Sequence, residues 1–430
     1  MILLLLFHTF LSVLSYGWFP LLDLKSYNTK KPSEIQIFDK KLVVWEKDNN
    51  IVVQDNACLH RGGPLSEGFI DNQSRNLKCS YHGWEFDQNG NIISLPQSNK
   101  KPDFCKFQKT YQTFQSCNIL WILYDDRDTP FPTHISKHNN SVSDDTFVIE
   151  VPYSINTLLE NFFDPAHIPF AHHKLQSTRD AASPVNSTLI TMDPSCLQIY
   201  FEDSTLPNKK YRNGTMSFYY PSHYLLNSTY PDIYIKRLHV YCVPVYPFRT
   251  RIFVQNEYNH KNNFRNALII NTIQSLPKWI KHPITHTFFD SDTMLLHKQE
   301  QMLKNKNSFF NSTKTYFTPS SSDYSIYLFH KWKNKFAPNW TSISYSSPLD
   351  LHLSRKQIFD RYHDHTIHCV SCSSALHSLQ TIQTYAPPLL LSQSMYFQNY
   401  FLALSAVFLY LIIDKIKPIY IFQDYIHNEL

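Results

Sequence analysis

The sequence predicts an α+β protein, in which an all-β domain precedes a helix-decorated antiparallel-sheet domain and a C-terminal transmembrane tail. Three observations support this prediction. Short apolar runs alternate with turn residues over 17–120, longer strand-like runs mix with helical patterns over 121–355, and an uncharged apolar run lies near the C-terminus. With 430 residues, 43% of them hydrophobic and 17% charged, the chain can bury sizeable cores.

Composition excludes several classes of protein. The formal net charge is +5 and the basic residues are scattered, so we expect no nucleic-acid partner. Eight cysteines are too few for a disulfide scaffold in a chain of this length. Five of the seven glycines fall in one short stretch: Gly62, Gly63, Gly68, Gly83 and Gly90. That clustering predicts tight turns or backbone pressed against a cofactor there.

Both domains contain recognisable elements. Residues 1–16 are apolar and are interpreted either as a targeting-like segment or as a plain apolar extension. In the all-β part, strands are predicted at Lys41–Trp45 and Ile51–Gln54.

The following domain, over 121–355, is predicted to hold an antiparallel sheet with helices on it. The predicted strands are Phe147–Val151, Tyr234–Val245 and Thr250–Gln255. The predicted helices are Ile155–Phe163 and Thr293–Lys304, the second with its apolar side chains on one face.

The tail divides into a segment with a Cys-x-x-Cys pair at 356–384 and a membrane anchor region at 385–430. Tyr400–Ile413 is a continuous uncharged and mostly apolar run, marginally long enough to cross a bilayer. Lys415 and Lys417 follow it and favour the cytoplasmic or stromal side. The alternative is a buried core helix.

Two Cys and two His alternate around the glycines, as Cys58-Leu59-His60 and Cys79-Ser80-Tyr81-His82. A zinc finger pairs Cys with Cys and His with His, whereas here each arm supplies one thiolate and one imidazole. That order suits a Rieske-type 2Fe–2S cluster, with two Cys on one iron and two His on the other. Nearby glycines let backbone N–H groups approach the cluster sulfurs.

A second constellation contains Asp164, His167 and His172. On a helix these residues share one face, and Pro169 between the histidines would kink it so that both imidazoles reach one metal. Two imidazoles and one carboxylate form the facial triad of non-haem Fe(II) oxygenases.

The carboxylate of this triad is predicted to come from further along the chain. The candidates are acidic residues downstream of the histidines: Asp290, Asp292, Glu300 and Asp323. We favour Asp292, with Asp290 second, and expect the two to open a helix, where either could instead be a cap. Asp164 is predicted to bridge the two metal centres by a hydrogen bond to a cluster histidine.

A Cys-x-x-Cys pair, Cys369 and Cys372, lies near the tail. We favour an exposed, redox-switchable dithiol. A small zinc site with His363, His365 or His368, or an inert pair, are the alternatives.

Together these motifs resemble Rieske non-haem iron oxygenases, and more narrowly the pheophorbide a oxygenase group with its Tic55-like relatives and chlorophyllide a oxygenase. The resemblance rests on Cys58–Trp84, Glu160–His173, Asp290 with Asp292, and His365–Cys372. Leu59 departs from the family, which usually has Pro there.

The resemblance implies one 2Fe–2S cluster held by Cys58, His60, Cys79 and His82. It also implies one mononuclear Fe(II) on His167, His172 and Asp292, with Asp164 as the bridge. The implied partners are a ferredoxin-type electron donor, O₂, a hydrophobic ring substrate such as a chlorophyll-derived tetrapyrrole, a plastid membrane, and thioredoxin at Cys369 and Cys372. A head-to-tail homotrimer is implied as well.

The expected function is therefore O₂-dependent oxygenation of a large hydrophobic ring compound by a plastid envelope or thylakoid protein. Two alternatives stay open. One is a redox-sensing, translocon-associated component, and the other is an oxygenase or desaturase that acts on a sterol-like lipid.

Overall fold

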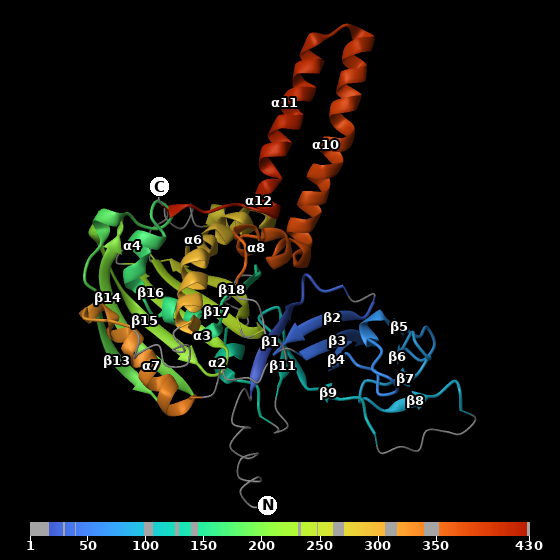
Figure 1. Cartoon of the computed structure of the whole chain (residues 1–430), viewed down its shortest axis with the longest axis horizontal. Coiled ribbons are helices and arrows are strands. Elements are labelled where there is room, and N and C mark those ends of the chain that lie inside the picture. Colours follow the sequence, from blue (N-terminus) through green and yellow to red (C-terminus); the bar gives the residue numbers. More distant parts are fainter. Residues whose placement is uncertain are drawn as a thin grey trace, which may run out of the picture.

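The computed structural model describes residues 17–28, 31–38, 40–98, 106–124, 129–138, 145–230, 234–246, 248–260, 271–305, 316–338 and 352–427. The predicted segment 1–16 lies outside these residues. A β domain and a larger sheet-and-helix domain lie side by side, and a long helical hairpin projects from the second (Figure 1).

The N-terminal domain consists of three small antiparallel sheets. The first has the order β1(Trp18–Asp23)-β11(Ile119–Leu123)-β10(Thr113–Ser116), the second β2(Ser33–Ile37)-β3(Lys40–Lys47)-β4(Asn50–Asp55)-β9(Thr110–Tyr111), and the third β5(Phe69–Ile70)-β6(Leu77–Lys78)-β7(Glu85–Phe86)-β8(Ile92–Ser94). The predicted strands Lys41–Trp45 and Ile51–Gln54 are confirmed inside β3 and β4. They pair with each other, Val44 opposite Val53, and both valines are fully buried.

The second domain is built on one seven-stranded antiparallel sheet with the order β12-β18-β17-β16-β15-β14-β13. Its strands are β12(Phe147–Val151), β13(Asn186–Met192), β14(Cys196–Leu206), β15(Lys210–Tyr219), β16(His223–Tyr230), β17(Tyr234–Tyr246) and β18(Arg249–His260). The three strands predicted in this domain are confirmed as β12, β17 and part of β18. Residues of alternate position face the core, because successive side chains of a strand point to opposite faces.

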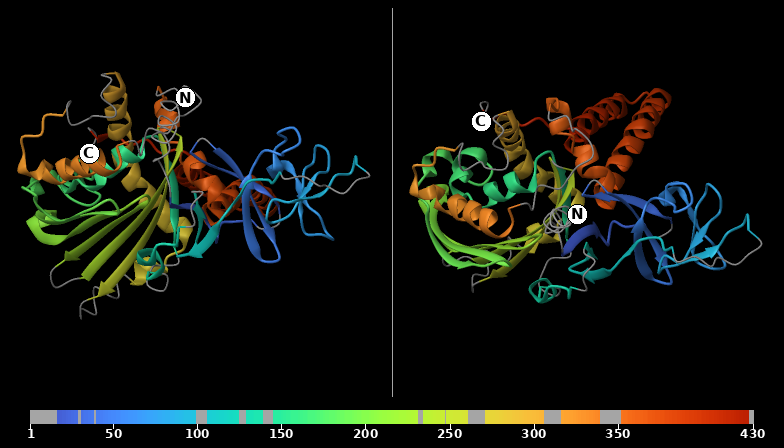
Figure 2. Two further views of the ribbon diagram at one scale, coloured as in Figure 1. Left: turned by 90° about the horizontal axis from the view of Figure 1, so that it is seen from below. Right: turned by 60° about the horizontal axis from the view of Figure 1, so that its bottom comes forward.

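Helices α3(Ile155–Phe162), α6(Lys278–Asn305) and α7(Tyr324–Phe336) gather over one face of this sheet (Figure 2). One buried cluster joins Leu159, Leu296 and Trp332 of these helices to Ile199 and Phe218 of the sheet. The prediction that Asp290 and Asp292 open a helix is wrong. α6 begins at Lys278, so both acids lie in its interior.

Short helices complete the domain: α2(Thr133–Ser136), α4(Ile168–Ala171), α8(Arg355–Ile358) and α9(Arg361–Asp364). The chain then forms the projecting hairpin from α10(Val370–Phe397) and α11(Tyr400–Ile416), and α12(Pro418–Ile421) returns to the body of the domain (Figure 1). Tyr420 of α12 is buried there.

The hairpin exposes large apolar side chains along most of its outer half, among them Phe401, Leu404 and Phe408. Nevertheless, no helix within the described residues combines the length and apolar character needed to cross a membrane. The predicted transmembrane tail is therefore not supported as a span.

Candidate metal centres

Cys58 and Cys79 each begin a tight turn, and the two turns are alike. In each, the cysteine carbonyl accepts a hydrogen bond of 2.8 Å from the N–H of a glycine four residues on, Gly62 or Gly83. These glycines have φ values of +71° and +72°, a region that side chains disfavour. Each cysteine N–H also donates to the carbonyl five residues on, at 2.9 Å. Gly62 and Gly83, two of the clustered glycines, are thus explained by the turns that present the two thiols.

The imidazoles of the same two turns face each other. The ring centroids of His60 and His82 are 4.5 Å apart, and His60 stacks on Trp84 at 4.6 Å. Nδ1 of His60 is buried and has no hydrogen-bond partner among the described residues. A buried, unpaired imidazole nitrogen in the same pair of turns as two buried thiols fits a Rieske-type cluster, since each iron would take two ligands of one kind.

His167, His172 and Asp292 come together at the other candidate centre. The Nε2 atoms of the two histidines are 3.3 Å apart. Asp292 places Oδ2 at 3.4 Å from Nε2 of His172 and Oδ1 at 4.0 Å from Nε2 of His167. These three groups are the donor set of a non-haem Fe(II) site.

Hydrogen bonds at the far side of each ring fix which nitrogen faces the centre. Nδ1 of His167 donates to the backbone carbonyl of Asp164. Nδ1 of His172 lies 2.7 Å from Oγ of Ser291, whose own hydroxyl donates to the carbonyl of Phe288 at 2.7 Å. Oγ must therefore accept the proton of Nδ1, so both Nε2 atoms present lone pairs to the same point. A cation between them relieves the repulsion of those lone pairs.

The local fold of this segment differs from the predicted kinked helix. Asp164 caps a 3₁₀ turn, Pro165–His167, by accepting from the N–H of Ala166 at 2.9 Å. Ile168–Ala171 then forms one turn of α-helix, and His172 leaves it with non-helical backbone angles. Two prolines at the starts of successive turns separate the segment into pieces, because proline suits the first turn of a helix and not its interior.

The other acidic candidates are occupied elsewhere. Asp290 pairs with Arg361, with 2.6 Å between Oδ2 and Nη2. Glu300 accepts from the backbone N–H of Ser154 at 2.8 Å, and Asp323 belongs to the capping box of a 3₁₀ turn. Burial raises the pKa of Asp290 to about 6 and that of Glu300 to about 7. Only Asp292 among the four candidates lies beside the two histidines.

Asp164 lies next to His167 as expected, with 3.9 Å between Oδ2 and Nδ1. Burial raises the pKa of its carboxyl group. Within the chain, the cluster turns lie at the end of the β domain and α4 lies at the opposite end of the molecule (Figure 1). A bridge from Asp164 to the cluster of the same chain is therefore excluded by position, and its bridging role stays a prediction about a neighbouring subunit.

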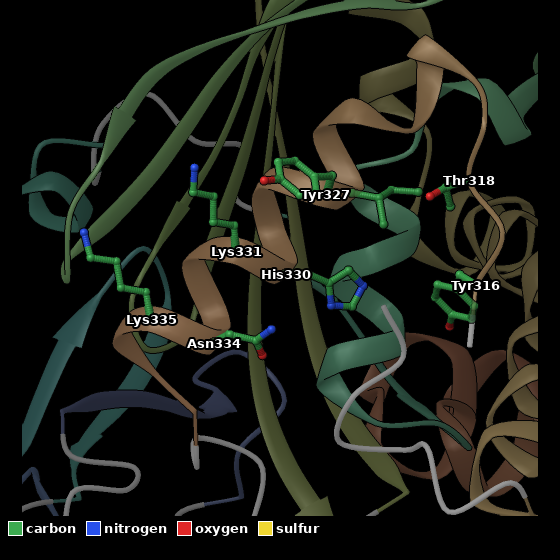
Figure 3. A pocket seen from close by; sticks show the side chains of 8 residues that line it. Tyr316, Thr318, Tyr327, His330, Lys331, Asn334 and Lys335 are labelled. Atoms are coloured by element: carbon green, nitrogen blue, oxygen red, sulfur yellow. The ribbon is translucent and has the colours of Figure 1, made fainter. Parts of the chain in front are cut away.

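One cavity of about 560 Å³ lies along α7 (Figure 3). It is lined by mixed polar and aromatic side chains: Tyr316, Thr318, Ile326, Tyr327, His330, Lys331, Asn334 and Lys335. His330 and Tyr316 both contact Glu160 of α3, at 3.1 and 2.9 Å. None of the lining residues belongs to a predicted metal site, so we assign no substrate to this cavity.

Cys369 and Cys372 are buried, with 7% and 0% of their surface exposed. The expectation of an exposed dithiol is therefore wrong, because the start of α10 packs against α6. Of the three nearby histidines, His365 joins the pair and His363 and His368 are exposed. The remaining partner is His282 of α6, which sequence reasoning missed.

Comparison with known proteins bears on both sites. Residues 17–113 match the family described as Rieske [2Fe-2S] domain, and residues 218–309 match the family described as pheophorbide a oxygenase. The second match includes Asp292, and the first includes all four predicted cluster ligands.

Several chloroplast proteins are similar over most of the chain. Pheophorbide a oxygenase of Oryza sativa subsp. japonica is 29% identical over 404 residues, covering 85% of this chain and 74% of its own. Flavonoid 8-hydroxylase 2 of Ocimum basilicum is 27% identical over 406 residues, with 85% and 74% covered. Protein TIC 55 of Arabidopsis thaliana is 22% identical over 426 residues, with 84% and 72% covered.

Among solved structures, dicamba monooxygenase bound to dicamba has the same fold, with a TM-score of 0.58 and 16% identity. The alignment covers 74% of this chain and 96% of that one. The all-β domain, the helix-covered sheet and the two matched domains define a Rieske-type oxygenase, and they imply a Rieske cluster and a mononuclear iron. Within that class the chain resembles the pheophorbide a oxygenase and Tic55-like group.

Proposed function

We propose that this protein uses O₂ and electrons from a ferredoxin-type donor to oxygenate a large hydrophobic ring compound, a chlorophyll-derived tetrapyrrole in the first place. The observation that carries the proposal is the convergence of two imidazole lone pairs and one carboxylate from His167, His172 and Asp292. Similarity to pheophorbide a oxygenases supports the choice of substrate.

In this proposal Cys58, His60, Cys79 and His82 hold the cluster, which supplies electrons, and the triad holds the iron, which supplies O₂ activation. The protein's own contribution is to hold the metal ligands in position. Ser291 holds His172 and the carbonyl of Asp164 holds His167, so each ring keeps its Nε2 directed at the metal. A site fixed before substrate arrives loses little free energy to reorganisation.

Electron transfer is proposed to occur between subunits. The two sites of one chain lie at opposite ends of the molecule, so a head-to-tail ring, a homotrimer, would bring a neighbour's cluster to α4 (Figure 1). In that arrangement the partly buried carboxyl group of Asp164 would hydrogen-bond a cluster histidine of the neighbour. Analytical ultracentrifugation tests the trimer, and a monomer with full turnover would contradict it.

The hairpin is proposed to attach the protein to a plastid membrane. Phe401, Leu404 and Phe408 are 74%, 69% and 66% exposed, and an apolar surface of this kind calls for an apolar environment. α11 has 17 residues and is about 25 Å long, less than the roughly 30 Å hydrocarbon core. We therefore infer that the hairpin dips into one leaflet from the side of the catalytic domain.

Flotation with vesicles of galactolipid and phosphatidylglycerol tests this attachment. Each buried Phe contributes about 1.5–3 kcal/mol, so the double variant Phe401→Ser, Phe408→Ser should lower vesicle binding by at least about tenfold. Phe317→Ser, which removes a 90% exposed ring outside the hairpin, is the matched control. Truncating the whole tail is a poor test, since it also removes the buried Tyr420.

The activity is tested by O₂ uptake of the full chain with reduced ferredoxin and a panel of pheophorbide a, a flavonoid and a sterol. We expect uptake and an oxygenated product with the tetrapyrrole, loss of both in His172→Ala, and retention in the neighbouring control His173→Ala. If only the flavonoid or only the sterol gives an oxygenated product, that compound class is the substrate and the tetrapyrrole proposal is wrong. If both metals are present and no compound raises O₂ uptake, the redox-sensing function is favoured instead.

A further inference from the structure

Four potential metal ligands meet where the hairpin joins the catalytic domain. They are His282 of α6, His365 at the end of α9, and Cys369 and Cys372 at the start of α10. All four are buried, none of them more than 7% exposed. None of them belongs to the Rieske turns or to the iron triad.

Four of the six distances between their ligand atoms are close to the edges of a tetrahedron around one metal ion, and all six are within 4.8 Å. Nδ1 of His282 is 3.1 Å from Nε2 of His365, 3.4 Å from Sγ of Cys369 and 3.7 Å from Sγ of Cys372. Nε2 of His365 is 3.4 Å from Sγ of Cys372. Zinc bonds of about 2.0–2.1 Å to nitrogen and about 2.3 Å to sulfur give tetrahedral edges of roughly 3.3 Å between nitrogens and roughly 3.6 Å between nitrogen and sulfur.

The outer nitrogen of each imidazole is held as in known zinc sites. Nε2 of His282 lies 3.0 Å from the carboxylate of Asp145, and Nδ1 of His365 lies 2.6 Å from the carbonyl of Val148. Both of these nitrogens must therefore carry the proton. Their inner nitrogens then present lone pairs to each other across 3.1 Å and to two sulfurs. A cation bound between them, with the thiols deprotonated, stabilises this arrangement.

We propose that His282, His365, Cys369 and Cys372 bind one structural zinc ion. Two thiolates and two imidazoles in tetrahedral arrangement select zinc over the oxygen-preferring cations. Four protein ligands, all buried, leave no open position, so the site is structural and not catalytic. This proposal is independent of the substrate and of the proposed activity.

The zinc ion connects the hairpin to the helix of the iron site. His282 and Asp292 lie on the same helix, α6, about 15 Å apart along its axis. A metal that fixes His282 to the start of α10 therefore sets how the hairpin is mounted on the helix that carries Asp292.

A second group of His and carboxylate side chains does not have the features of a zinc site. His138, His239 and Glu257 approach one another, but Arg237 already pairs with Glu257 at 2.6 Å. A guanidinium at that distance neutralises the carboxylate and opposes a second cation. Sulfur ligands are absent from that group too, so we do not extend the proposal to it.

Zinc content and zinc X-ray absorption of the full-length, metal-replete wild-type protein test the proposal. We expect one zinc per chain, and a zinc shell of two sulfurs at about 2.3 Å and two nitrogens at about 2.0–2.1 Å. Zinc well below one per chain, a shell without sulfur, or iron in this coordination would overturn it. So would a disulfide between Cys369 and Cys372 in the protein as isolated, which is the result that a redox-switchable dithiol predicts.

Variants assign the site to these residues. Cys372→Ser and His282→Gln should lower zinc from one per chain to near zero while the Rieske electron paramagnetic resonance signal persists. Cys196→Ser and His363→Gln are matched controls outside the cluster and should keep zinc. Full zinc in both site variants would overturn the assignment, and if they fail to fold, the wild-type absorption spectrum decides.

Discussion

Replacing Asp290 by Asn leaves the buried guanidinium of Arg361 without its counter-charge. The two side chains are 3% and 1% exposed, and Oδ2 of Asp290 accepts from both Nε and Nη2, at 2.9 and 2.6 Å. Arg361 also donates to the carbonyl of Ile419 at 3.0 Å, which ties α12 to α9. The ion pair therefore supports the packing of the chain that returns from the hairpin.

The expected loss is large because one partner of a buried pair remains charged. Removing one partner typically costs about 3–5 kcal/mol. For a domain of about 150–250 residues each kcal/mol lowers the unfolding temperature by about 2–4 °C, so Asp290→Asn should lower it by about 6–20 °C. Asn keeps one acceptor for Arg361, which favours the lower half of that range.

Asp292→Asn is the matched comparison, two residues along the same helix. Its carboxylate lies beside His167 and His172 and is proposed to bind iron. We expect this variant to lose most of the mononuclear iron and to unfold within about 2 °C of the wild type once the iron is removed from both. Asp290→Asn should retain the iron.

Differential scanning calorimetry and iron analysis beside the Rieske signal measure both outcomes. We assign Asp292 to the iron and Asp290 to Arg361. This assignment would be falsified if Asp290→Asn lost the mononuclear iron without being destabilised while Asp292→Asn kept both its iron and its stability. An Asp290→Asn variant as stable as the wild type would show that the charge of Arg361 is compensated by another group.

Three further predictions concern the electron path and the buried acid of α6. Cys58→Ser should abolish the Rieske electron paramagnetic resonance signal, and an unaltered spectrum would contradict the cluster assignment. His167→Ala should stop turnover and keep that signal. Asp164→Asn should keep both metals and slow electron transfer at least tenfold in single-turnover kinetics. Loss of the mononuclear iron in Asp164→Asn would instead show that Asp164 is a ligand. Burial raises the pKa of Glu300 from 4.5 to about 7, so the folded chain holds this proton more tightly than the unfolded chain. The stability that this proton contributes is therefore complete below pH 4.5 and is lost as the pH rises to about 7. Between pH 4.5 and pH 8 the free energy of unfolding of Glu300→Gln should therefore fall by about 3 kcal/mol less than that of the wild type. Urea unfolding of both proteins at the two pH values measures this difference. Parallel pH profiles of variant and wild type would refute the shift.

The local part of each metal site could be read from the sequence. Cys58 and His60, like Cys79 and His82, are so close along the chain that any turn brings them together, and the glycines showed where the turns lie. The strands of both domains followed equally from short-range alternation of apolar residues. These features depend on neighbours in sequence, and the sequence contains that information directly.

Helix α6 was only partly predictable. The apolar face of Thr293–Lys304 indicated a helix over those residues, with Asp290 and Asp292 at its beginning. In the structure α6 begins at Lys278 and runs through Pro283, so the two acids lie in the interior of the helix. Residues two apart on a helix point about 200° apart, so one reaches the histidines and the other reaches Arg361.

The sequence by itself determined the two kinds of metal site and the residue types that build them. The sequence favoured Asp292 over Asp290, but only the tertiary structure placed Asp292 beside both histidines and brought His282 to Cys369 and Cys372. Those contacts join residues far apart along the chain, and their geometry depends on how α6 packs against the turns and the hairpin. Such packing reflects the fit of whole surfaces, which no local pattern of residues records.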